Sequence, residues 1–240
     1  MWAVYKKEIR QFFSSLTGYI AIIIFLLVNG LFLFVFSDNI FDAGYSTLDK
    51  FFEFAPWILL LLIPAITMRS LSDEYREGTF ELLKTRPLTI RQIVGGKYMA
   101  GLTVMGMALL PTLIYFYSVQ QLSAQGGIDI GGTTGSYFGL FFLAAVFVSI
   151  GLFCSSFTNN AVVSFIAGAF LCFLVYNGFH AISRLSSFVA GADYYIEMLG
   201  LDFHYRSISR GVIDSRDIIY FLSLIFLFLF LTDRRLVNRK

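Results

Sequence analysis

The sequence predicts an all-α membrane protein with six transmembrane helices, and three observations carry this prediction. Hydrophobic residues make up 57% of the 240 residues and charged residues only 14%, whereas soluble domains carry about 25% charged residues. The mean hydropathy is +0.73. The apolar residues form long continuous runs rather than an alternating pattern, which predicts helices and excludes transmembrane strands.

Six apolar runs are long enough to consider as spans, and they cover residues 19–36, 51–68, 98–119, 137–157, 161–179 and 218–231. A helix needs about 20 residues to cross a hydrocarbon core about 30 Å thick. The last run is short, so its helix must extend outward through Asp217, or Arg234 and Arg235 must reach the interface with their long side chains. The stretch SSFTNN at 155–160 is expected to be a tight turn between the fourth and fifth spans.

The distribution of Lys and Arg predicts the orientation. With the N-terminus inside, an even number of spans places both termini in the cytoplasm, and 13 of the 18 Lys and Arg residues fall on the inner side. The net charge of only +2 predicts no nucleic-acid partner. No internal repeat or soluble domain is evident, so residues 1–240 are predicted to form one membrane domain.

The N-terminal segment is amphipathic. Its apolar side chains fall on one arc of a helix and its cations on the rest, which is typical of a helix lying in the membrane interface. The alternative is a plain cytoplasmic extension of the first span, which is expected to be retained because no small-residue cleavage site follows it. The residues that define the interfacial helix are Trp2, Lys6, Lys7, Arg10 and Phe13.

The insert at 69–97 carries six Lys or Arg and four Asp or Glu, so it must lie in water between the second and third spans. Ser72 is expected to cap a helix that runs through Leu83 and stops before Pro87. Gly78 inside that helix costs about 1 kcal/mol and marks a bend or a close approach. Thr89 is expected to cap a second short helix over 90–94. A solvated loop would explain the charge, but it would leave apolar side chains such as Phe80 uncovered.

The outer segment at 181–217 contains a helical stripe formed by Leu201, Tyr205, Ile208 and Val212. This pattern predicts a helix that lies on the outer leaflet or dips partly into it. The polar and small residues singled out with it are Arg206, Arg210 and Gly211.

Residue patterns for catalysis or metal binding are lacking. Gly96-Lys97 is followed by Tyr98, so the nucleotide-binding loop pattern fails. His180 and His204 are expected to have polar rather than metal-binding roles, and Cys154 and Cys172 fall inside apolar runs. An ion-coupled carrier or a membrane-embedded lipid transferase would need acids or histidines within the spans, where only Glu53 lies, near the outer edge.

Pro64 and Pro111 are expected to bend the second and third spans. The glycines at 131, 135 and 139 are expected to allow close helix contact. Asn29 and Asn177 are expected to make hydrogen bonds between helices.

These parts together resemble the ABC-2 type transporter permease family. The insert carries the sharpest similarity, with EYREGTFELL at 74–83, TRPLT at 85–89 and Gly96-Lys97-Tyr98 opening the third span. The segments at 6–20, 56–70 and 209–221 are similar to the gliding-motility-associated permease subunits of Bacteroidetes-type bacteria.

The resemblance implies a half-transporter in the bacterial inner membrane, an exporter linked to gliding motility. It would pair with a second permease subunit, as a homodimer or heterodimer, and with separate ATPase subunits that hold ATP and Mg, so this chain would need no cofactor. The insert would be the coupling helix that docks on the ATPase. A non-transporting scaffold that holds an ATPase in a motility or secretion machine is the alternative. The implied docking residues are Glu74, Arg76, Gly78, Thr79, Phe80, Glu81, Leu83, Arg86 and Pro87.

Overall fold

The computed structural model describes residues 1–36, 39–43, 46–84, 87–123, 127–184, 193–211 and 214–238, and these residues form helices with no strand among them. The helices are α1 (Trp2–Ser14), α2 (Leu16–Phe34), α3 (Ile40–Ala43), α4 (Asp49–Thr67), α5 (Arg69–Arg76), α6 (Thr79–Lys84), α7 (Ile90–Leu109), η1 (Leu110–Thr112), α8 (Leu113–Leu122), α9 (Ile130–Ser155), α10 (Ala161–Phe173), η2 (Leu174–Gly178), α11 (Phe179–Ser183), α12 (Asp193–Glu197), α13 (Leu201–Ser209) and α14 (Ser215–Asn238).

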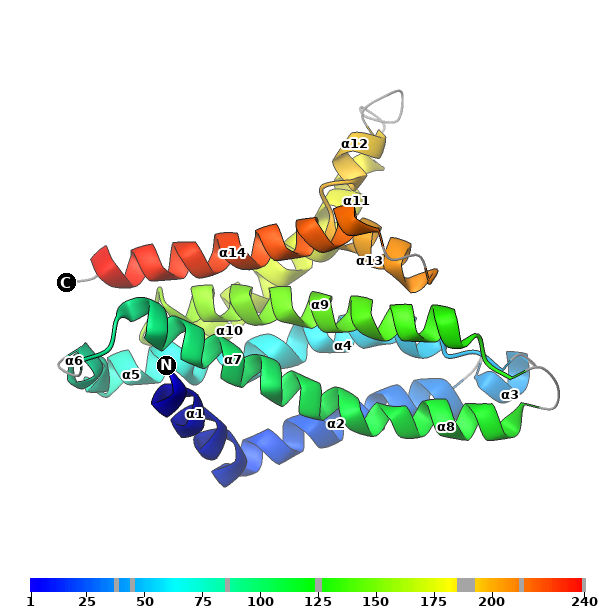
Figure 1. The fold of residues 1–240 in the computed structure, drawn as a ribbon, viewed down its shortest axis with the longest axis horizontal. Coiled ribbons are helices and arrows are strands. Elements are labelled where there is room, and N and C mark those ends of the chain that lie inside the picture. The colour runs from blue at the N-terminus through cyan, green and yellow to red at the C-terminus, as the bar shows by residue number, and fades with distance from the viewer. Residues whose placement is uncertain are drawn as a thin grey trace.

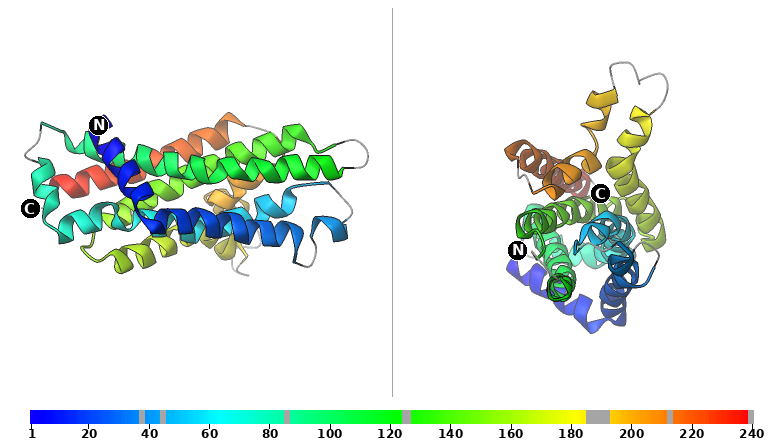
Figure 2. Two further views of the ribbon diagram at one scale, coloured as in Figure 1. Left: turned by 90° about the horizontal axis from the view of Figure 1, so that it is seen from below. Right: turned by 90° about the vertical axis from the view of Figure 1, so that its right-hand side faces the viewer.

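The helices form an elongated bundle with both ends of the described chain at one end of it (Figure 1, Figure 2). We call this the terminal end, and the opposite end the distal end. The central helix is α9, which packs against α4, α7, α10, α13 and α14. Its side chains are mostly buried within the protein because other helices surround it.

Within the described ranges, five helical segments are long and apolar enough to cross a membrane, so the chain is a multi-pass membrane protein. They are Asp49–Arg76, Ile90–Leu122, Ile130–Ser155, Ala161–Ser183 and Ser215–Asn238. A sixth is obtained if α1 and α2, which meet at an angle of 69°, are counted together. The sequence prediction of an all-helical membrane protein is therefore confirmed, with five or six candidate spans.

The last span is longer than its apolar run. Helix α14 has 24 residues, so it extends past both ends of the predicted 218–231. Asp217 is buried in its first turn, and at its other end Arg234 and Arg235 lie over the rings of Phe230 and Phe157, at 5.0 and 4.9 Å. The helix thus both extends outward through Asp217 and places the long side chains of Arg234 and Arg235 at its other end.

Two spans contain irregular turns. The segment Ile90–Leu122 passes through the 3₁₀ turn η1, which contains Pro111, because proline has no N–H to continue the α-helical pattern. The segment Ala161–Ser183 passes through the π-helical turn η2, which contains Asn177. Pro64 lies inside α4, where Gly168 of α10 approaches its ring. The turn at 155–160 is confirmed, and Asn160 caps α10 by accepting a hydrogen bond from the Val162 N–H.

The insert differs from the sequence prediction at its start. Ser72 is not a helix cap, because α4 continues into α5 as one 28-residue helical segment. The Ser72 hydroxyl is buried and donates to the Met68 carbonyl. The single helix expected up to Leu83 is also wrong. Gly78 has φ +70°, a left-handed conformation that ends α5 and separates it from α6.

The second part of the insert was predicted more closely. Thr89 forms a capping box with Gln92, as expected for a helix start. The helix is not a separate short one over 90–94, however, because it continues through Leu109.

Candidate functional site

A buried ion cluster joins three helices at the terminal end. The Lys97 ammonium on α7 lies 2.7 Å from Glu8 Oε1 on α1 and 2.9 Å from Glu74 Oε1 on α5, and it donates to the Ser70 carbonyl at 2.6 Å. The Lys97 side chain is 0% exposed. A buried charge needs such partners, so the cluster fixes the mutual positions of α1, α5 and α7.

Lys7 extends this cluster to the surface. Its ammonium donates to Glu74 Oε1 at 2.8 Å, while 48% of its side chain stays exposed. Burial by itself lowers the pKa of Lys7, but the hydrogen bond to Glu74 and the charges of Glu74, Glu8 and Glu77 outweigh burial and raise that pKa above 10.5.

The close packing of α1 on α7 depends on a glycine. A Cβ at Gly96 would lie 2.9 Å from the Met1 carbonyl oxygen and 3.0 Å from Val4 Cβ. Val4 is buried there, and the Tyr5 hydroxyl lies 3.1 Å from Thr103 Oγ1. In the Gly96-Lys97 pair, the glycine therefore makes room for α1 and the lysine holds it.

A small apolar cluster supports the insert beside these ions. It consists of Leu71, Phe80, Val94 and Leu236, with the Tyr75 ring 4.7 Å from the Phe80 ring. Phe80 is only 3% exposed. Phe80 is among the implied docking residues, but the chain itself covers its ring in this structure.

A group of exposed residues near the turn between α5 and α6 forms a second feature, which we call the charged corner. It comprises Arg76, Glu77, Gly78 and Glu81, all exposed at the turn between α5 and α6. Arg76 pairs with Asp73 at 3.2 Å and with Glu77 at 3.7 Å. Nothing lies within 4 Å of a Cβ placed on Gly78, so the turn faces open space.

The other implied docking residues are divided. Glu74 belongs to the buried cluster and not to the exposed surface. Thr79 is half-buried and its hydroxyl donates to the Glu74 carbonyl at 3.4 Å, while Pro87 is exposed. The Leu83 side chain and Arg86 lie outside the described part of the chain.

The junction of α4 and α5 is tied to the central helix. Ser155 Oγ on α9 donates to the Met68 carbonyl and accepts from the N–H groups of Leu71 and Ser72, at 3.0, 3.0 and 3.1 Å. One turn earlier, a Cβ at Gly151 would lie 2.0 Å from Thr67 Oγ1. Movement of α5 must therefore act on α9 as well.

The N-terminal segment predicted to be an interfacial helix is helical, as α1. It exposes Trp2, Lys6, Lys7 and Arg10, and Phe13 is half-buried. Its single acid, Glu8, turns inward to Lys97.

The residues predicted in the outer segment lie at α13, which packs on α9 and not on a free surface. Leu201, Tyr205 and Ile208 of the predicted stripe are buried within the protein, and Val212 lies outside the described residues. The glycines of α9 receive this helix, because a Cβ at Gly135 would lie 3.0 Å from the Ile208 carbonyl oxygen.

Tyr205 and Gly211 have clear structural roles. The Tyr205 hydroxyl donates to the Phe52 carbonyl at 2.8 Å, and burial raises the pKa of this tyrosine above its usual value. Gly211 has φ +82° and its backbone contacts Gly132. Arg206 pairs with Asp202 and Glu197, whereas Arg210 is exposed.

The two histidines have carboxylate partners. His204 is buried, with Nδ1 2.7 Å from Asp217 Oδ1 and Nε2 2.9 Å from the Met198 carbonyl oxygen. His180 Nδ1 lies 3.0 Å from Glu197 Oε1. Within the described ranges, no group of three His, Cys, Asp or Glu side chains could hold a metal ion. Cys154 and Cys172 are free and buried.

Sequence reasoning missed Glu8, Lys97 and Ser155 as site residues. Two signals pointed to the ion pair: Glu8 is the only acid among the cations of the N-terminal helix, and Lys97 directly precedes an apolar run. Ser155 had no signal, because its role comes from a contact with residues more than 80 positions earlier.

Comparison with known proteins agrees with this arrangement. A family model described as ABC-2 family transporter protein matches residues 2–190. No individual curated protein matches the chain. The matched region contains α1, the insert and the helices up to α11, so it includes the ion cluster and the charged corner. The chain belongs to the ABC-2 transporter family, whose members are membrane transport components that generally lack an ATPase site of their own.

Proposed function

We propose that this chain is the permease subunit of an ATP-driven transporter and that a separate ATPase subunit docks on the charged corner. One observation supports the proposal most directly. The helical segment Asp49–Arg76 runs from the distal end of the bundle to this corner, and Ser155 of α9 holds the junction of its two helices, α4 and α5. A force applied at Arg76 would therefore act on α4 and, through Ser155, on the central helix α9.

The surroundings of the corner favour transmission of movement. The buried cluster of Glu8, Glu74 and Lys97 fastens α5 to α1 and α7, and Ser155 fastens it to α9. Closure of the ATPase around its nucleotide would push the corner, and these links would carry a rigid-body displacement into the bundle. ATP and Mg belong to the partner in this scheme.

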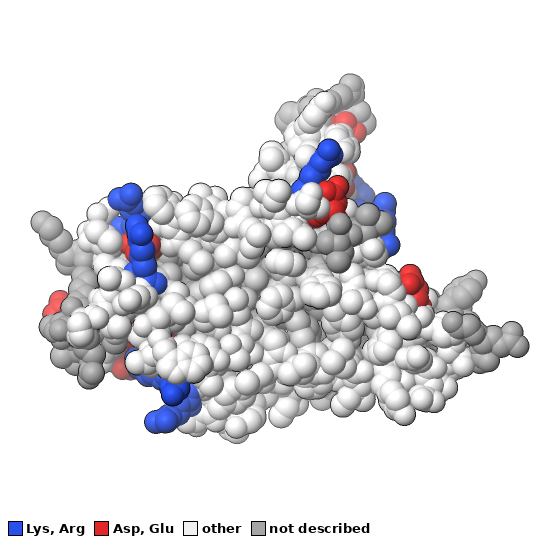
Figure 3. Space-filling view, in the orientation of Figure 1, with Lys and Arg blue, Asp and Glu red and all other residues white. Residues whose placement is uncertain are grey.

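The finer assignment is part of the same proposal. The motifs at 74–83 and 85–89 and the segments similar to gliding-motility permeases support an exporter linked to gliding motility. A second permease subunit would complete the path. The charge pattern supports a bacterial inner membrane with both termini in the cytoplasm. On the face in Figure 3, Lys and Arg gather over the terminal end while the middle of the bundle is nearly uncharged.

The test is capture of the co-expressed ATPase by tagged permease. Reversing the exposed charges together, as R76E/E77K/E81K, should lower ATPase capture roughly tenfold or more, because like charges then face the partner. The matched control is Glu53→Lys at the distal end, where the side chain is 63% exposed, and it should leave capture unchanged. Full capture by the triple variant, with normal abundance in the membrane, would refute docking at the corner.

A further inference from the structure

Three cations at the terminal end each lie over an aromatic ring. Lys6 Nζ is 5.4 Å from the centre of the Trp2 ring, and Arg234 and Arg235 lie 5.0 and 4.9 Å from the rings of Phe230 and Phe157. Aromatic rings and long cationic side chains collect where hydrocarbon meets headgroups. These pairs on α1 and α14 therefore mark the headgroup level of the bilayer at this end.

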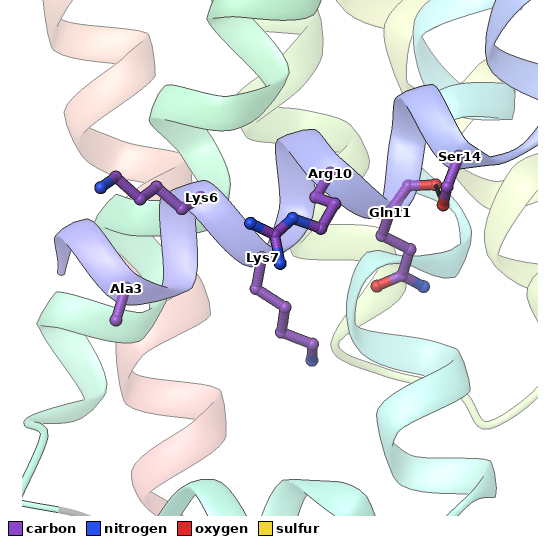
Figure 4. A pocket seen from close by; sticks show the side chains of 6 residues that line it. All are labelled: Ala3, Lys6, Lys7, Arg10, Gln11 and Ser14. Carbon is purple, nitrogen blue, oxygen red and sulfur yellow. Dashed lines mark hydrogen bonds between the residues drawn. The ribbon is translucent and has the colours of Figure 1, made fainter.

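Helix α1 lies across the bundle at that level. It meets α2 at 69°, and its inner side, with Val4 and Glu8, packs on α7. Its outer side forms an open groove of about 570 Å³, lined by Ala3, Lys6, Lys7, Arg10, Gln11 and Ser14. Figure 4 shows that all six side chains belong to α1 and that Lys7 and Arg10 lie beside one another.

The groove has cations and hydrogen-bond donors but no acid. Glu8 is the single acid of α1, and Lys97 binds it on the opposite side of the helix. Glu74, on α5, takes one donor of the Lys7 ammonium. An ammonium has three donors, so two remain for a ligand, and the guanidinium of Arg10 offers five more.

We propose that this groove binds the headgroup of an anionic phospholipid, of the phosphatidylglycerol type. The phosphate lies between Lys6, Lys7 and Arg10, Gln11 donates to the glycerol headgroup, and the acyl chains run past the exposed Trp2 and Leu16. The positive charge of the groove and its open shape both match this ligand. The inference relies on the proposed placement of α1 at the membrane surface but does not require the ATPase.

The binding site has a consequence for the insert. Lys7 would contact the lipid phosphate and Glu74 at the same time, and Glu74 shares Lys97 with Glu8. A lipid in the groove therefore joins the ion network that holds α5, the helix that leads to the charged corner.

Trp2 supplies a direct probe, because the chain has only two tryptophans. In a Trp57→Phe background, the emission of Trp2 is measured in nanodiscs of phosphatidylcholine that contain increasing fractions of phosphatidylglycerol with brominated acyl chains. Brominated phosphatidylcholine serves as the reference lipid. Half-maximal quenching should need at least roughly tenfold less of the anionic lipid than of the reference lipid, because the cations of the groove attract the net negative charge of the anionic headgroup.

Two matched variants locate the site. K6Q/R10Q should reduce the preference for phosphatidylglycerol to about twofold or less, while R234Q/R235Q, with the same loss of charge at the same end, should keep it. Equal quenching by both lipids in the parent protein, or equal losses in both variants, would overturn the proposal.

Two further arms separate other ligands. Millimolar glycerol phosphate in the buffer should leave the preference for phosphatidylglycerol intact. If this soluble anion abolished the preference, the groove would be a site for free phosphate instead. If K6Q/R10Q abolished ATPase capture while the lipid preference persisted, the groove would be a protein-docking surface and the proposal would be wrong. Weak quenching of Trp2 by every brominated lipid would show that α1 lies away from the bilayer.

Discussion

Lys97 Nζ lies 2.9 Å from Glu74 Oε1, and the Lys97 side chain has no exposed surface. The same ammonium binds Glu8 on α1. The insert is therefore fixed from within the chain, while Arg76, Glu77 and Glu81 face outward at its charged corner. In the proposed function, the buried residues give mechanical support and these exposed residues contact the partner.

Replacement of Lys97 by methionine should destabilise the protein strongly. Glu8 would lose its cation and Glu74 would keep only the half-exposed Lys7, and breaking a buried ion pair from one side costs about 3–5 kcal/mol. The measurement is thermal unfolding in a neutral detergent. The triple variant E8Q/E74Q/K97M should regain most of the loss, because it removes the unpaired charges as well. A single Lys97→Met variant as stable as the parent would contradict the cluster.

Gly151→Ala should also destabilise, by about 1–3 kcal/mol, because the added Cβ would overlap Thr67 Oγ1 between α9 and α4. Gly106→Ala on α7 is the matched control, since nothing lies within 4 Å of its Cβ. That control should be neutral or slightly stabilising. Unfolding temperatures of the two variants compare them directly, and equal values would show that the close contact is not rigid.

The raised pKa of Lys7 predicts an alkaline dependence of stability. A cation whose pKa is higher in the folded state stabilises that state fully below its unfolded pKa of 10.5, and the contribution is lost as pH rises through the folded value. The difference in unfolding temperature between the parent and Lys7→Gln should be constant up to about pH 10 and then shrink. A difference that grows with pH would have the wrong sign.

Asp217→Asn should loosen the contact between α13 and α14. The two ring nitrogens of His204 lie 2.7 Å from Asp217 Oδ1 and 2.9 Å from the Met198 carbonyl oxygen, so the ring ties α13 to α14. An amide in place of the carboxylate weakens this buried contact, at a cost of about 1–3 kcal/mol. Limited proteolysis of the segment before α14 should become roughly tenfold faster, and Glu53→Gln should not change it.

Much of the fold could be predicted because lipid imposes strong constraints on sequence. Long uncharged runs located the candidate spans, and the Thr89 cap followed from local backbone chemistry, whereas Gly78 ends a helix that was expected to continue. The helix boundaries were less accurate. Polar residues such as Asp217 extend a span when a tertiary partner is present, and periodicity in the chain gives no information about that partner.

The candidate site was predictable only in outline. The charges of the insert marked it as a water-exposed segment, but they did not show which of its residues turn inward. Glu74 and Phe80 looked like contact residues, and the structure buries both because Lys97 and Leu236 approach from distant parts of the chain. The residues next to Glu74 and Phe80 in the sequence do not show that Lys97 and Leu236 contact them in the fold.

The most direct test of the central claim is photo-crosslinking in the assembled transporter. A photoreactive amino acid is placed at Glu77, at Glu81 or, as a control, at Glu53 at the distal end. We expect crosslinks to the ATPase subunit from positions 77 and 81 and none from position 53. Crosslinks from position 53, with none from the charged corner, would contradict the account.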